Sequence, residues 1–388
     1  MPITRCSATA TTPASRSSDS ERMTVTDTAV SAGSSASAAD AVSAVTGADD
    51  ASPRPPRVAL TRTLFLVGAA VLLVGVFLLS LWVGARGIAF AEIWEALWQA
   101  DGGETSYIVH EMRLPRAGLA LLVGAALGVA GALIQALTRN PLADTGILGV
   151  GAGANVAVVV AIGLFGITAI SQYMWFAFFG AVVVTVIVYA LGSIGAAGAT
   201  PVRLTLVGIA LGAVLGGFAS AITMLHPTSF DDMLRWSAGS LAGRGWSTLA
   251  TVAVPIVIGL LIGAIAGRPL NAISLGDDVA RSLGANVMRT RVLVIIAVTL
   301  LAGAATAAAG PIGFVGLMVP HVVRWFTGPD QRWIIPFSAV GAALLLLASD
   351  VVGRVILAPQ ELEVGIVTAF VGAPVLIILA RRRKVSTL

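Results

Sequence analysis

Long apolar runs, separated by short polar turns, fill the chain from Leu60 almost to its C-terminus. A helix needs about 20 consecutive apolar residues to cross the hydrocarbon core of a bilayer. Ten runs approach this length, although the eighth is short and interrupted by glycines and prolines, so by length alone it could be re-entrant. The predicted spans are residues 62–84, 115–137, 145–166, 173–192, 202–225, 248–267, 289–309, 311–325, 333–354 and 364–381. We therefore expect an all-α polytopic membrane protein with about ten transmembrane helices.

Residues 1–57 have a different composition. They are rich in Ser, Ala, Thr and Asp, and they contain no apolar run of signal-peptide length. Because such a segment cannot bury enough apolar surface to fold, we expect a disordered cytoplasmic tail that ends at the proline-rich turn of residues 53–57. The membrane domain then covers residues 58–388, and Met23 could be the true start.

Composition and charge support the membrane assignment. Of the 388 residues, 57% are hydrophobic and 11% are charged, whereas a soluble globular chain is about 25% charged. With the tail inside and ten crossings, 18 of the 24 Lys and Arg residues fall on the inner side, in keeping with the positive-inside rule. With nine crossings the basic cluster at residues 381–384 would face outward, so we expect the eighth run to cross and both termini to be cytoplasmic. The other basic residues are scattered, which argues against nucleic-acid binding.

Residues that could carry covalent chemistry are scarce. Cys6 is the only cysteine, so neither an internal disulfide nor a cysteine-based metal cluster can form. Lys384 is the only lysine, which excludes a phosphate-binding loop of the GxxxxGK[ST] type. The three histidines lie in different segments and no acidic pair shares a span, so we expect no metal site, no catalytic residue and no cofactor in this chain. If transport uses ATP and Mg²⁺, a separate ATPase chain must bind them.

Ionisable residues fall at the ends of the spans, as Asp144, Arg203, Asp350 and Glu363 do. An ion-coupled carrier usually keeps such a residue near the middle of the bilayer, so the energy is expected to come from outside this chain. An ion-coupled secondary transporter, which would work without an ATPase, remains the weaker alternative. A membrane scaffold that transports nothing is a third.

Glycines recur four residues apart inside the spans, a spacing that lets helix backbones approach closely in lipid. We expect most of these pairs to pack within one subunit, whereas some could lie at a seam between subunits. The sets are Gly124/Gly128, Gly149/Gly153, Gly208/Gly212/Gly216 and Gly259/Gly263/Gly267.

Two short polar stretches lie at the ends of the second span. The outer stretch has the sequence RLPR over residues 113–116. Its two arginines, Arg113 and Arg116, either extend to the membrane interface beside a helix-start proline or form a cationic patch that docks an acidic partner. In the inner stretch, Asn140 and Pro141 signal a turn, and Asp144 is suited to cap the third span. We expect the inner stretch to be structural.

The sequence of the longest inner loop predicts a short helix at residues 276–284. These residues lie in the stretch SLGDDVARSLG, residues 274–284. Asp277 and Asp278 suit a helix N-terminus, Arg281 suits the last turn, and Gly284 suits the position after the end, while Gly276 precedes the helix. Its apolar residues are expected on one face, which either rests on lipid headgroups or docks into a groove of a soluble partner. These apolar residues are Val279, Ala280 and Leu283.

The eighth span has the sequence GPIGFVGLMVPHVVR over residues 310–324. Spans broken by glycine and proline often line transport routes. His321 lies at the inner end, where a capping or hydrogen-bonding role is expected rather than metal binding.

In order, these motifs resemble the FecCD family, the permease subunits of ABC importers for iron-siderophore, haem and cobalamin. The shared pattern is RLPR, then NPLA, then an inner acidic helix ending in A-x-x-LG, then IGFVGL-x-x-PH-x-x-R, then a terminal G-x-x-T-x-x-x-GAP at residues 365–374. The match covers roughly residues 60–384. Its motif residues include Asn140, Pro141, Gly313, Gly316, Pro320, His321, Arg324, Gly372 and Pro374.

The resemblance implies a cobalamin-importer-permease-like fold in the cytoplasmic membrane of a bacterium. It implies a second permease, identical or homologous, with the translocation route at the interface between the two. It also implies two ATPase subunits, which the inner helix of residues 276–284 contacts, and an extracytoplasmic substrate-binding protein. That protein's carboxylates would pair with Arg113, Arg116 and Arg354, although Asp350, four residues before Arg354, competes for it.

Three positions depart from the family pattern. Thr145 replaces a common proline and is expected to relax the start of the third span. Asp277 and Asp278 replace a Glu pair and keep its charge, and Glu363 replaces a common proline near the outer end of the last span. The expected function is ATP-driven import of an Fe(III)-siderophore by alternating access, with cobalamin or haem as the alternative cargo.

Overall fold

The computed structural model describes residues 56–84, 87–98, 102–194, 200–226 and 230–381, and all regular structure in these ranges is helical. The predicted tail of residues 1–57 lies outside them, except that the first helix already includes residues 56 and 57. We call the two ends of the bundle outer and inner after the orientation that the charges predict. The helices run α2 (Pro56–Trp82), α3 (Phe90–Trp98), α4 (Glu104–Tyr107), η1 (Ile108–Arg113), α5 (Leu114–Thr138), η2 (Thr145–Leu148), α6 (Val150–Gly163), α7 (Ile170–Gly192), α8 (Pro201–Leu225), α9 (Phe230–Ala238), α10 (Trp246–Ser274), α11 (Asp277–Ser282), α12 (Val287–Ala309), α13 (Val315–Thr327), α14 (Gln331–Ile356) and α15 (Val364–Arg381).

Each of the ten predicted spans coincides with a helix of this structure. Within the described part of the chain, seven helices are long and apolar enough to cross a membrane: α2, the continuous helix α4–η1–α5, α7, α8, α10, α12 and α14. The helices α6, α13 and α15 are shorter, so the multi-pass helical class is confirmed, whereas the count of ten crossings stays a prediction. Short helices at the outer end, α3, α4 and α9, were not expected.

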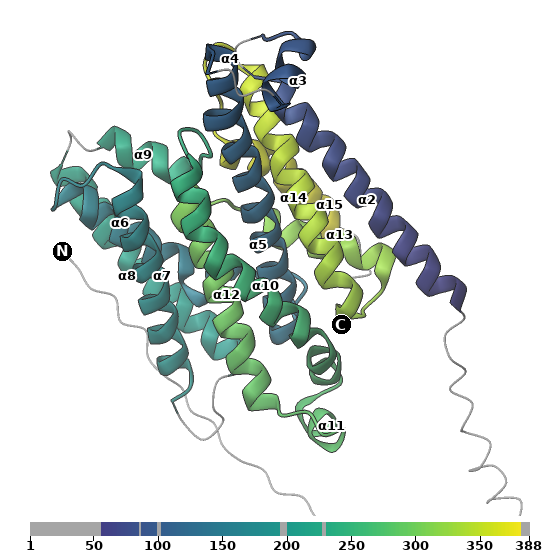
Figure 1. Cartoon of the computed structure of the whole chain (residues 1–388). Helices are drawn as coiled ribbons and strands as arrows, with labels where there is room; N and C mark the ends of the chain where they lie inside the picture. Colours follow the sequence, from purple (N-terminus) through teal and green to yellow (C-terminus); the bar gives the residue numbers. More distant parts are fainter. Residues whose placement is uncertain (1–55, 85–86, 99–101, 195–199, 227–229, 382–388) are drawn as a thin grey trace, which may run out of the picture. The chain divides into compact units, whose positions relative to one another are not determined.

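Helix α5 forms the centre of the bundle (Figure 1). It packs against α10, α12, α13 and α14, and most of its side chains are buried. Glycines make these contacts close, because a Cβ atom at Gly124 would lie 2.6 Å from the Cα atom of Ala343 on α14. The glycine spacings therefore serve packing within the subunit at Gly124, Gly128, Gly153, Gly208 and Gly259, as expected.

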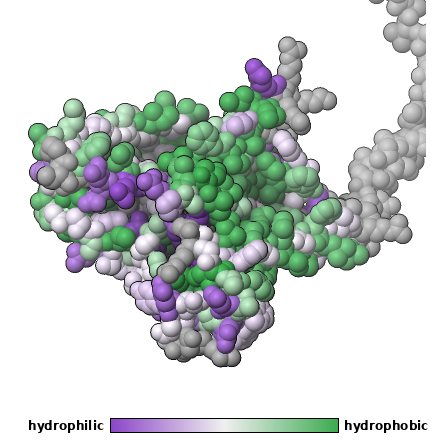
Figure 2. Space-filling model, turned by 90° about the horizontal axis from the view of Figure 1, so that it is seen from above, coloured by the Kyte–Doolittle hydropathy of each residue, from purple (hydrophilic) through white to green (hydrophobic). Residues whose placement is uncertain are grey.

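Helix α2 and helix α8 have mostly exposed apolar side chains. Figure 1 shows α2 at one side of the bundle, where it lies along α14. A Cβ atom added at Gly216 of α8 would have nothing within 4 Å of it, in contrast to the five packed glycines above. Seen from the end that holds α3, α4 and α9, hydrophobic surface extends over much of this face and hydrophilic residues gather in smaller patches (Figure 2).

Two predicted helix starts differ from the structure. The third span does not begin at residue 145, because a 3-10 turn ends at Gly149, whose φ of +70° breaks the helix before α6 begins at Val150. Pro115 does not start a helix either, since the chain is already helical from Glu104 through the π-helical segment η1. A π-helical turn leaves backbone groups out of the regular ladder, and it can therefore accommodate a proline that donates no hydrogen bond.

Candidate functional site

The inner helix α11 forms where the sequence predicts it. Gly276 precedes it with a φ of +116°, and Gly284 follows it with a φ of +81°. Asp277 and Asp278 occupy the first turn and Arg281 the last, and Arg281 also pairs with Asp278 at 2.9 Å on the exposed surface. The charges therefore complement the helix dipole as expected.

Asp277 also connects α11 to two long helices. One carboxylate oxygen pairs with Arg139 at 2.5 Å, and the other pairs with Arg291 at 2.6 Å. Arg139 caps the C-terminus of α5 in a left-handed conformation, and Arg291 lies in the first turns of α12. A movement of α11 would therefore act on both helices through one side chain. Neither arginine is predicted as a partner of Asp277 from the sequence.

The apolar residues of α11 do not share one face, which corrects the prediction. Ala280 is fully buried and packs against Ile273 and Val287. Val279 and Leu283 are exposed, and so is Leu275 just before the helix. Because Val279 and Leu283 are spaced by four along the same helix, they form one exposed apolar edge on an otherwise charged helix, whereas Leu275 lies beyond the break at Gly276.

The inner turn after α5 is held by its own side chains. Asn140 accepts a hydrogen bond from the backbone N–H of Leu142 at 3.0 Å, and Asp144 accepts one from Gly146 at 3.1 Å. Asp144 thus caps the 3-10 helix η2, which confirms its capping role at the start of this segment. The backbone of Pro141 faces the ring of His321, so two motifs far apart in the sequence meet here.

Gln135 compensates for the proline inside α13. Pro320 has no N–H group, so the carbonyl of Gly316, four residues earlier, lacks its helical donor. The Gln135 amide donates to this carbonyl at 3.3 Å and to that of Leu317 at 3.0 Å. Gln135 is completely buried in α5, and its role could not be read from the sequence because its partners are about 180 residues away.

The other motif residues of α13 are also buried. His321 makes an edge-to-face contact with Trp325 at 6.0 Å between ring centroids. The side-chain nitrogens of Arg324 have no hydrogen-bond partner among the described residues. Just before α13, Phe314 adopts a φ of +67°, and its ring fills the space where a side chain at Gly372 of α15 would lie. The motif of residues 310–324 and the terminal motif of residues 365–374 are therefore in contact.

The side chains of the three arginines assigned to partner docking point into the protein in this structure and not out to solvent. Arg113 is buried and donates to the carbonyls of Leu81 and Trp82 at 2.7 and 2.8 Å. Arg354 is buried and donates to the carbonyls of Ser80 and Val83 at 2.9 and 3.2 Å. The last carbonyls of a helix have no partner within the helix, so these two guanidinium groups cap the C-terminus of α2.

A buried carboxylate completes this network. Asp350 pairs with Arg116 at 2.8 Å and with Arg354, which confirms the competing pair within α14. Arg116 also pairs with Glu361 at 2.7 Å, near the surface. The three arginines thus do not form an exposed cationic patch in this conformation, which corrects that interpretation of the RLPR motif, and docking of a binding protein stays a prediction.

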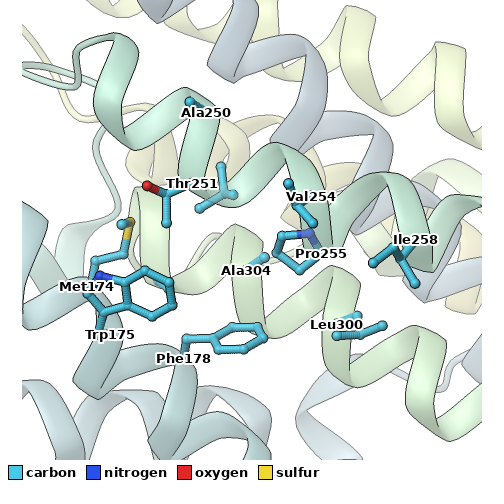
Figure 3. A pocket seen from close by; sticks show the side chains of 12 residues that line it. Met174, Trp175, Phe178, Ala250, Thr251, Val254, Pro255, Ile258, Leu300 and Ala304 are labelled. Atoms are coloured by element: carbon cyan, nitrogen blue, oxygen red, sulfur yellow. The ribbon is translucent and has the colours of Figure 1, made fainter.

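Two apolar grooves open on different sides of the bundle. Figure 3 shows the first, about 450 Å³ in volume, where Trp175 and Phe178 of α7 face Pro255 of α10 and Leu300 of α12. Its one hydroxyl, that of Thr251, donates to the backbone of its own helix, so the groove is an apolar surface. The second, about 590 Å³, lies between α9 and α15 and is lined by Pro311, Phe370 and Pro374, among others.

Comparisons with known proteins agree with this arrangement of motifs. The ferric enterobactin transport system permease protein FepD of Escherichia coli is 46% identical over 326 residues, which cover 84% of this chain and 97% of FepD. The Fe(3+)-citrate import system permease protein YfmD of Bacillus subtilis is 40% identical over 321 residues, covering 83% and 95% of the two chains. A solved structure, described as an inward-facing metal-chelate type ABC transporter, has a TM-score of 0.73 at 27% identity and covers 82% of this chain and 99% of its own.

The family model for the FecCD transport family matches residues 72–382. These residues contain every motif described above, and only the first residues of α2 precede the match. With a match over most of the membrane domain and relatives well above 30% identity across nearly their whole length, this chain belongs to the FecCD transport family.

Proposed function

We propose that this chain is the permease subunit of an ATP-driven ABC importer that carries Fe(III)-siderophores across the cytoplasmic membrane of a bacterium. The observation that carries the proposal is the match to a siderophore permease over 84% of the chain, with the inner helix α11 and the Gly372–Phe314 contact in support. Haem or cobalamin would use the same architecture and is the alternative cargo. Uptake of labelled ferric siderophores by cells with and without this chain tests the proposal.

A second permease would cover the face formed by α8, α9 and α15. The side chains of Ile209 on α8 and Phe370 on α15 are exposed and apolar. The groove between α9 and α15 opens at the same face, and Gly216 leaves the backbone of α8 accessible for close approach. In this arrangement the substrate route runs between two such faces.

The ATPase subunits, which bind ATP and Mg²⁺, would dock on α11. The exposed edge of Val279 and Leu283 fits an apolar groove on a soluble partner. Asp277 would transmit the movement of this helix to α5 and α12 through Arg139 and Arg291. The permease pair then alternates between its outward-open and inward-open states.

Val279→Asp should abolish both copurification of the ATPase and uptake, because a carboxylate would enter a desolvated apolar contact. The folded state of the permease should be preserved, since Val279 is exposed in the isolated chain. The measurement is the amount of ATPase retained on the tagged permease, with its thermal melting as a check on folding. Arg281→Gln, on the opposite side of the same helix, is the matched control, and retention of the ATPase by Val279→Asp would contradict the docking site.

A soluble binding protein would deliver the substrate to the outer end. Arg116 is the arginine of the network that reaches the surface through its pair with Glu361, whose carboxylate is partly exposed. Docking would then replace Glu361 with a carboxylate of the partner, while Arg113 and Arg354 continue to hold α2. This exchange keeps the docking role that the family resemblance assigns for Arg116 alone, and it gives Arg113 and Arg354 a structural role.

A further inference from the structure

The outer helix α3 carries a stripe of exposed aromatic side chains that the transport function does not use. Phe90, Trp94 and Trp98 are spaced by four residues, and together with Trp82 at the end of α2 they form the aromatic stripe. The ring centroids lie 6.1 Å apart for Trp82 and Phe90, 6.4 Å for Phe90 and Trp94, and 6.0 Å for Trp94 and Trp98. All four side chains are exposed, by 47% to 75%, which is unusual for a row of large aromatic residues.

The other sides of α3 have different characters. Ile93 and Ala96 are buried and pack with Val109 of η1, so the helix is fixed to the bundle. The ring of His110 also hydrogen bonds to the carbonyl of Ala96 at 2.9 Å. Glu92 and Glu95 are exposed on the side away from the aromatic stripe. The stripe therefore has a fixed direction relative to the bundle.

The position of the stripe along α2 indicates its depth in the membrane. The apolar span of α2 covers Leu60–Trp82 and faces lipid over most of its surface. Twenty-three helical residues extend about 35 Å, slightly more than the hydrocarbon thickness of about 30 Å. Trp82 thus lies at the outer boundary of the hydrocarbon, and the stripe continues from the lipid-facing surface of α2 at this depth.

We propose that the aromatic stripe lies in the boundary between headgroups and acyl chains of the outer leaflet and anchors the outer end of α2. Tryptophan and other aromatic rings favour this boundary because they are apolar with a polar edge. The charged side of α3 carries only carboxylates, so the anchor depends on ring burial and not on attraction to anionic lipid. Since α2 has few contacts apart from those with α14, its outer end is held by the stripe together with the caps of Arg113 and Arg354.

Spin-label accessibility in the full chain tests this placement. In a Cys6→Ser background, a nitroxide is attached at Trp94→Cys or at Phe90→Cys, which keeps both tryptophans of α3 in case the first variant does not fold. The matched controls are Glu92→Cys and Glu95→Cys on the same helix. The protein is reconstituted in nanodiscs of phosphatidylcholine and phosphatidylglycerol, and collision rates with oxygen and with a neutral nickel chelate are compared.

We expect the stripe labels to collide mainly with oxygen and the control labels mainly with the nickel chelate. The preference of the stripe labels should be the same at low and high salt, because no charge attraction is involved. A stripe label that prefers the nickel chelate would place the stripe in water and overturn the proposal. Exclusion of both reagents from the stripe would also overturn it, because protein would then cover the stripe.

Discussion

Asp350→Asn should destabilise the folded protein by about 3–5 kcal/mol, the usual cost of removing one partner from a buried ion pair. Asp350 is 2% exposed and pairs with both Arg116 and Arg354. Without the charge at residue 350, Arg354 has no carboxylate partner among the described residues, and Arg116 keeps only the carboxylate of Glu361. We expect a large fall in melting temperature and the first loss of structure at the outer end of α2.

The measurement is thermal unfolding in detergent, followed by intrinsic fluorescence and by size-exclusion chromatography. Asp278→Asn is the matched control, because the same chemical change removes an exposed pair with Arg281, and exposed pairs contribute little. If the two variants melt at the same temperature, the buried network does not stabilise the fold.

Gly131→Ala should prevent normal folding of the bundle. An added Cβ atom would overlap the carbonyl oxygen of Gly316 and lie 2.6 Å from its Cα atom. Because these contacts are all with backbone, α5 and α13 would have to separate, which would also break the hydrogen bonds from Gln135 to Gly316 and Leu317. The expected result is a severe loss of folded, monodisperse protein. The overlapping atoms belong to the backbone, which cannot move aside as a flexible side chain could.

Gly75→Ala on α2 is the control for this substitution, because nothing lies within 4 Å of the added atom. There, alanine should be neutral or stabilising by up to about 1 kcal/mol through its better helix propensity. Equal yields of the two variants in membranes and after extraction would show that the crossing of α5 and α13 is looser than the structure indicates.

Apolar runs predict the helices at all ten expected spans, to within a few residues at most ends, because the membrane requires continuous apolar helix. They do not predict α3, α4 or α9, which are short helices at the outer end, too short to register as spans. The helix break at Gly149 and the π-helical segment η1 also escaped prediction. Both depend on local backbone geometry that a hydropathy pattern does not contain.

The sequence predicts those parts of the candidate site whose residues lie close together along the chain. The charges and glycines of α11 lie within nine residues, and they placed this helix correctly, although the inward turn of Ala280 depends on contacts with Ile273 and Val287. Arg139, Gln135 and Glu361 were missed because each acts on a residue more than 100 positions away. For the same reason Arg113 and Arg116 were interpreted as surface groups, whereas their partners are the end of α2 and Asp350.

The most direct test of the transport proposal is uptake of radiolabelled ferric siderophores by bacterial cells with and without this chain, beside a strain whose ATPase cannot hydrolyse ATP. Haem and cobalamin uptake are measured in parallel. We expect both mutants to lose uptake of one ferric siderophore and to keep haem and cobalamin uptake. Ferric-siderophore uptake that persists in the ATPase-dead strain but depends on this chain would contradict ATP-driven import, and loss of only haem or cobalamin uptake would contradict the proposed cargo.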